Sequence, residues 1–88
     1  MTKLIEFRDE AGHFVAVVRE VPKPHGIATV QPDMEGVLAA KPQWRKAHEA
    51  GRLELWTSSN SWTNVRYEVI MRPRAGGQPK RLYGRYLP

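Results

Sequence analysis

Basic side chains crowd the C-terminal end of the chain. Residues 64–88 contain a single acidic side chain, Glu68, and six basic ones: Arg66, Arg72, Arg74, Lys80, Arg81 and Arg85. This segment therefore holds the whole net charge of +5, because residues 1–63 contain eight basic and eight acidic side chains. Charge segregated in this way behaves as a surface patch and favours a polyanionic or acidic partner.

The same segment reads as a β-hairpin that would present these groups together. A strand from Trp62 to Met71 alternates apolar and polar residues, and a second strand runs from Arg81 to Leu87, with Gly76 and Gly77 at the tip. Because side chains alternate with period two, we expect one outer face to gather cations from both strands. Guanidinium groups match phosphate oxygens, and an aromatic ring can stack on an unpaired base. The predicted nucleic-acid interface comprises Arg66, Arg72, Arg74, Lys80, Arg81, Tyr83 and Arg85.

Two other interpretations of the basic hairpin remain open. A cationic ribbon can also dock on an acidic protein surface, and charges on edge strands often serve only to prevent aggregation. The pair Trp56 and Trp62 brackets a polar stretch at residues 57–61, which we expect to be a loop. Two indoles beside hydroxyl groups could stack on a base or anchor a protein partner, although a Trp in a small domain more commonly belongs to the core.

No pattern of catalytic or metal-binding residues emerges from the sequence. The three histidines are His13, His25 and His48, and the His48-Glu49 pair lacks the second histidine at helical spacing that a zinc site needs. The serines of residues 57–61 have neither a glycine-framed turn nor a nearby histidine. We therefore expect no enzyme, no cofactor and no metal. A small nuclease that uses His48 or Glu68 with Arg66 and Arg85 would require acid–base geometry that sequence does not reveal.

The rest of the chain supplies the elements that must position the hairpin. Residues 3–8 and 13–21 predict a first β-hairpin, with Gly12 in its turn. A proline-rich connector follows at residues 22–26. A helix then begins near Pro32, is interrupted at Pro42, and resumes over residues 43–50 up to Gly51. Two short helices could form a helix-turn-helix, but a kinked amphipathic helix on the sheet fits this tight break better. Residues 52–56 predict a further short strand.

These elements predict an α+β fold in a single domain, residues 1–88. An N-terminal β-hairpin, a central kinked helical segment and a C-terminal β-hairpin would form an antiparallel sheet with helix on one face. The strand order does not follow from the sequence.

Composition narrows the class of protein further. The chain is 41% hydrophobic, typical of a globular domain, and has no cysteine, which fits a reducing cytoplasm. Its longest apolar run, Phe14 to Val18, is far short of the ~20 residues that span a bilayer, so we expect no membrane association. A core this small would gain buried area from a homodimer.

We therefore predict a small, non-catalytic nucleic-acid-binding accessory protein that uses its basic C-terminal hairpin, without a preference between DNA and RNA. The alternative is a protein-interaction module or inhibitor, for example of mobile-element origin, that docks on an acidic surface of a larger protein or nucleoprotein complex.

Overall fold

The computed structural model describes residues 3–23, 29–60 and 65–88. Its elements follow the chain in the order β1 (Leu4–Asp9), β2 (Phe14–Pro22), β3 (Val30–Pro32), α1 (Met34–Ala39), α2 (Pro42–Glu49), β4 (Leu53–Ser59), β5 (Tyr67–Pro73) and β6 (Lys80–Tyr86). The α+β class and both predicted hairpins, β1–β2 and β5–β6, are confirmed. The strand predicted from Trp62 to Met71 is wrong for Val65 and Arg66, because β5 begins at Tyr67 and continues to Pro73.

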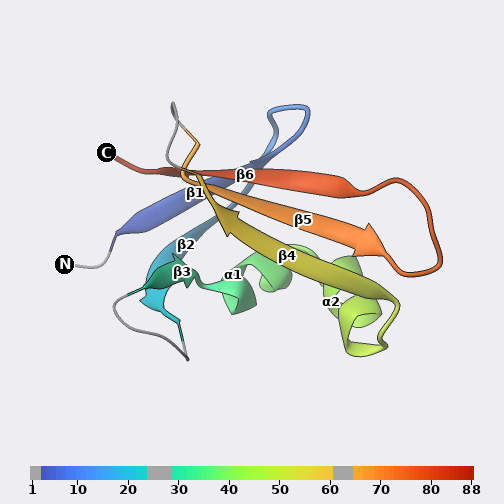
Figure 1. The fold of residues 1–88 in the computed structure, drawn as a ribbon. Coiled ribbons are helices and arrows are strands. Elements are labelled where there is room, and N and C mark those ends of the chain that lie inside the picture. Colours follow the sequence, from blue (N-terminus) through green and yellow to red (C-terminus); the bar gives the residue numbers. More distant parts are fainter. Residues whose placement is uncertain (1–2, 24–28, 61–64) are drawn as a thin grey trace.

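All strand pairings are antiparallel, and the six strands form one sheet in the order β3-β2-β1-β6-β5-β4. The two hairpins meet through β1 and β6, in a register that places Phe7 opposite Gly84. Gly84 is buried, and a Cβ atom there would lie 2.7 Å from Cε1 of Phe7. Glycine at this position therefore lets the Phe7 ring lie against the neighbouring backbone. Figure 1 shows this central pairing and the helices on one side of the sheet.

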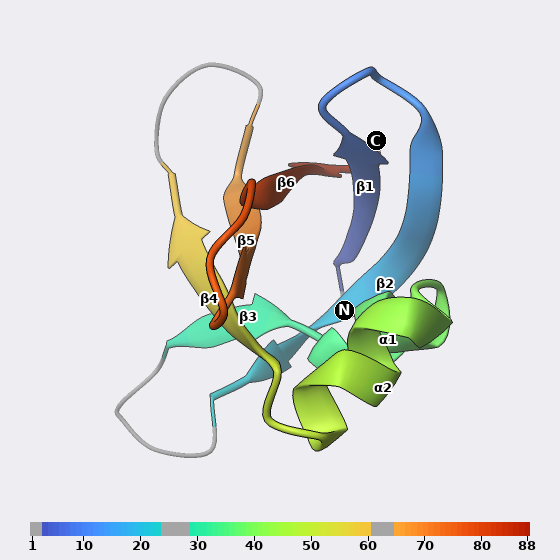
Figure 2. The same ribbon diagram turned by 90° about the vertical axis from the view of Figure 1, so that its right-hand side faces the viewer.

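The sheet curls until it is nearly barrel-shaped, which the prediction of a simple two-hairpin sheet did not include (Figure 2). In a flat sheet β2 and β5 would lie about 14 Å apart, because two strands separate them. Yet the hydroxyl of Tyr67 on β5 donates a hydrogen bond of 2.7 Å to the carboxylate of Glu20 on β2. The right-handed twist of strands favours such coiling once a sheet has six of them.

The concave face holds the core, and the helices pack against it. Val37 and Leu38 of α1 and Trp44 of α2 join the side chains that point inward from the strands: Ile5, Phe7, Ala16, Val18, Leu53, Tyr67, Val69, Met71 and Leu82. Pro42 lacks the amide donor needed to continue α1 and instead occupies the first turn of α2. The predicted break between two short helices is therefore confirmed.

The prediction of a loop over residues 57–61 is wrong for Thr57, Ser58 and Ser59. These residues continue β4, where Ser58 is paired with Glu68 and Ser59 with Tyr67. Thr57 is β-branched and itself favours a strand, and Ser58 and Ser59 continue the strand because β5 offers an edge with which they can pair.

Candidate functional site

The convex, outer face of the sheet carries the charged and exposed aromatic side chains. Each strand buries every second residue, so the intervening residues point away from the helices. Its members on the four strands from β1 to β4 in sheet order are Leu4, Glu6, Arg8, Arg81, Tyr83, Arg85, Glu68, Ile70, Arg72, Glu54, Trp56 and Ser58.

Trp56 is the most prominent apolar group on β4, with 55% of its surface exposed. It is paired with Ile70 on β5, and Ile70 is in turn paired with Arg81 on β6. Arg72, which is exposed, lies two residues from Ile70 on the same face and is paired with Glu54. The exposed indole thus has Arg72 diagonal to it across the β4–β5 pair. We call this area the Trp56 patch: Arg52, Glu54, Trp56, Ile70, Arg72, Arg74 and Arg81.

Arg52 belongs to this patch although the sequence did not single it out. Gly51, at φ +72°, ends α2, and the amides of Gly51 and Arg52 donate to the carbonyls of His48 and Ala47. This Schellman motif turns the chain so that β4 begins next to β5. The carbonyl of Arg52 accepts a hydrogen bond of 3.0 Å from the amide of Arg74, so two arginines stand opposite each other. The helix-ending glycine was the signal that could have placed Arg52 there.

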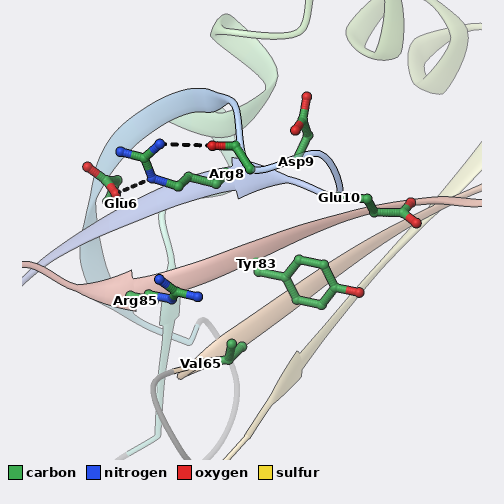
Figure 3. Close-up of a pocket in the computed structure, with 8 residues that line it drawn as sticks. Glu6, Arg8, Asp9, Glu10, Val65, Tyr83 and Arg85 are labelled. Carbon is green, nitrogen blue, oxygen red and sulfur yellow. Dashed lines mark hydrogen bonds and ion pairs between the residues drawn. The ribbon is translucent and has the colours of Figure 1, made fainter.

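A second feature of the outer face is an open hollow of about 580 Å³ beside the β1–β2 turn. Figure 3 shows Tyr83 in its middle, Arg8 and Arg85 toward one end, and Glu10 toward the other. We call it the Tyr83 hollow; its lining is Glu6, Arg8, Asp9, Glu10, Gly12, Val65, Tyr83 and Arg85. None of its β1 residues or turn residues was predicted as part of a site.

The two acids of the turn are held in place by backbone amides. The Asp9 carboxylate accepts hydrogen bonds from the amides of His13 (2.9 Å) and Ala11 (3.0 Å), which lower its pKa. The Glu10 carboxylate accepts from the backbone amide of Arg81, at 2.9 Å. The β1–β2 turn is thereby fastened to the start of β6, which fixes one wall of the Tyr83 hollow.

Three of the six predicted cations have partners inside the molecule. Arg81 forms an ion pair of 2.7 Å with Glu68, and this hydrogen bond raises the pKa of Arg81. Arg74 lies 3.9 Å from Glu54. Arg66, which we expected on the outer face, instead donates from Nε to the hydroxyl of Tyr86 at 3.1 Å.

Arg72, Lys80 and Arg85 are exposed and have no ion pair among the described residues. Lys80 borders a different hollow of about 360 Å³, together with Lys41 and Trp44. In the β5–β6 register Arg72 falls opposite residue 79, which is six positions before Arg85. At about 3.3 Å per residue, Arg72 and Arg85 are therefore about 20 Å apart along the strands. The predicted cations therefore do not form one continuous patch. Trp62 lies outside the described residues.

Arg66 belongs to an internal polar cluster that joins β2, β5 and β6. The hydroxyls of Tyr67 and Tyr86 both donate to Oε2 of Glu20, at 2.7 and 2.5 Å. The Arg66 guanidinium lies 5.5 Å from the ring centroid of Tyr67 and 5.8 Å from that of Tyr86. Burial and the bond to Glu20 raise the pKa of Tyr67. These groups satisfy one another, so we assign them to the closure of the sheet.

Within residues 3–23, 29–60 and 65–88, no three His, Asp or Glu side chains lie close enough together to hold a metal ion. Nor does either of the described helices have the length and apolar character needed to cross a membrane.

The chain matches no protein-family model, and comparisons with curated proteins and with solved structures gave no significant match.

Proposed function

We propose that this protein is a non-catalytic protein-interaction module that docks the outer face of its sheet on an acidic surface of a larger partner. The observation that carries the proposal is the exposure of Trp56 close to Arg72, on a face whose opposite side is occupied by the core. Trp, Tyr and Arg dominate the binding energy of protein interfaces, and a central aromatic anchor ringed by polar groups is their usual arrangement.

The mixture of charges on the outer face supports a protein partner over a nucleic acid. Glu54 lies inside the Trp56 patch and Glu68 borders it as the ion-pair partner of Arg81. Glu6 forms an ion pair of 2.8 Å with Arg8 at the Tyr83 hollow. A phosphate backbone is uniformly negative and is repelled by such acids, whereas a protein surface can place a cation or a hydrogen-bond donor opposite each of them. Complementarity of both signs gives specificity as well as attraction.

Nucleic-acid binding through the same face is the second candidate function. It is favoured by the net charge of +5 and by the proximity of Arg72, which can contact a phosphate, to Trp56, on which a base can stack. A complex of this kind would weaken steeply with salt, because each neutralised phosphate releases counterions.

A titration with three probes tests the proposal. Two peptides carry equal numbers of glutamates, with leucine at the remaining positions of one and serine at those of the other; the third probe is a single-stranded thymidine oligonucleotide. We expect the leucine peptide to bind most tightly and Trp56→Ala to abolish its advantage over the serine peptide. Phe14→Ala, which removes an equally exposed aromatic (58%) on β2, is the control. Tightest binding by the oligonucleotide would instead support the second candidate.

A further inference from the structure

The Tyr83 hollow has groups of opposite charge at its two ends, and each has capacity left for a ligand. Glu6 is paired with Arg85 across β1 and β6, but its carboxylate bonds Nε of Arg8 at 2.8 Å. Arg8 also donates from Nη1 to the carbonyl of Gly12, at 2.9 Å. Arg85 is thus left without an acidic partner among the described residues, and its guanidinium is open to an external carboxylate.

Glu10 provides the opposite end of the hollow. One oxygen of its carboxylate, Oε1, accepts the backbone amide of Arg81, while no described donor bonds the other oxygen. The guanidinium of Arg81 bonds Glu68 at 2.7 Å and acts on Glu10 only through a weaker coulombic attraction. Asp9 adds negative charge nearby, and its carboxylate is bound by the turn amides. This end therefore suits a cation.

Tyr83 is half-buried and lies between the two ends, where it lines the hollow (Figure 3). The backbone amide of Arg81 binds Glu10. Arg85 lies four positions further along β6, a distance of about 13 Å in an extended strand. Two side chains four positions apart in an extended peptide lie on one face at the same spacing. The hollow thus matches an extended segment in its charges, its length and its apolar middle.

We infer that the Tyr83 hollow binds an extended segment of the partner that carries an acidic side chain and a basic side chain four positions apart. The acid lies against Arg85, the base against Glu10, and the residue midway between them packs on Tyr83. This inference rests on the proposed function, because it names the part of the partner that the outer face receives.

The test uses three short peptides of serine and valine that differ only at two positions four residues apart. One carries aspartate and lysine, one two aspartates and one two lysines. Calorimetry should show that the mixed peptide binds about tenfold more tightly than either of the others, since each charged group then meets its complement. Arg85→Gln and Glu10→Gln should each remove most of this preference, and Glu10→Gln should strengthen binding of the two-aspartate peptide.

Arg19→Gln is the matched control, since it removes an exposed arginine from β2, away from the hollow, and should leave the mixed peptide's affinity unchanged. If the two-aspartate peptide binds most tightly, or if Glu10→Gln leaves the affinity for the mixed peptide unchanged, the hollow is a plain anion site and the inference is overturned. Displacement of the mixed peptide by the thymidine oligonucleotide at lower concentration would overturn it in favour of nucleic acid. If the mixed peptide fails while the leucine–glutamate peptide still binds through Trp56, only this inference falls; if neither binds, the proposed function falls with it.

Discussion

The guanidinium of Arg81 on β6 donates from Nη1 to the carboxylate of Glu68 on β5 over 2.7 Å. The two side chains lie on the outer face, diagonal to each other across the hairpin. Both remain partly exposed, so solvent screens the pair and it adds little to stability. Its main consequence is electrostatic: Glu68 cancels the charge of Arg81 and separates the positive end of the Trp56 patch from the Tyr83 hollow.

Removal of this internal acid should strengthen binding to acidic ligands. Glu68→Gln leaves Arg81 free to face a partner and is expected to raise the affinity for the leucine–glutamate peptide about fivefold, corresponding to about 1 kcal/mol. Glu49→Gln, which removes an exposed acid from α2, should change this affinity less. Fluorescence anisotropy at constant salt measures both values. Equal gains in the two variants would mean that only net charge matters and that the outer face has no special role.

Trp56 should contribute to binding but little to folding. Because its indole is more than half exposed, Trp56→Ala should alter the free energy of unfolding by no more than about 0.5 kcal/mol. Trp44, which is buried against the core and has Lys41 over its ring, provides the contrast: Trp44→Ala should cost about 3–5 kcal/mol. Denaturant unfolding of the two variants gives both numbers. A large loss of stability in Trp56→Ala would assign this indole to the core.

Stability should decline above about pH 10 because of Tyr67. The folded protein favours the protonated phenol, which is buried and donates to Glu20, so its pKa is raised above the ordinary value of 10.0. A group whose pKa is raised by folding contributes its full stabilisation at a pH below the pKa of the unfolded state. This stabilisation is lost as the pH rises from the pKa of the unfolded state toward that of the folded state. The difference in unfolding free energy between wild type and Tyr67→Phe should therefore shrink from pH 8 to pH 11. A constant difference over that range would show that Tyr67 ionises normally.

Gly84 should tolerate no larger side chain. In Gly84→Ala the new methyl group would lie 2.7 Å from Cε1 of Phe7 and 2.9 Å from Cγ2 of Ile5, inside the core. We expect a loss of about 1–3 kcal/mol, measured by denaturant unfolding. Phe7→Leu in the same chain should recover part of the loss, because it removes the ring that the methyl group meets. A double variant that is less stable than the sum of the two single effects would contradict this explanation.

The alternation of residues was sufficient to predict both hairpins. Phe7, Val69 and Leu82 lie inward as their period-two spacing requires, and Pro42 and Gly51 mark the helix boundaries where their backbone chemistry places them. Local rules of this kind act within a few residues, so a single sequence reveals them.

Contacts between distant segments could not be predicted in the same way. In the curled sheet Tyr67 bonds Glu20, 47 positions earlier in the chain, and no short sequence pattern encodes that pairing. Arg66 lies an even number of positions from Arg72, so the alternation predicts that both side chains are on the outer face. The Arg66 side chain instead bonds the hydroxyl of Tyr86. The ion pair between Arg81 and Glu68 likewise follows from the register in which β5 and β6 pair, and the sequence does not give that register.

The central claim is tested most directly by affinity capture on the immobilised protein, with nuclease present, followed by titration of the recovered component against wild type and Trp56→Ala. The account predicts one stoichiometric protein partner that survives nuclease treatment and binds Trp56→Ala at least about tenfold more weakly, as expected for a central aromatic anchor. Loss of all bound material upon nuclease treatment, or equal affinity of the partner for both forms, would contradict it.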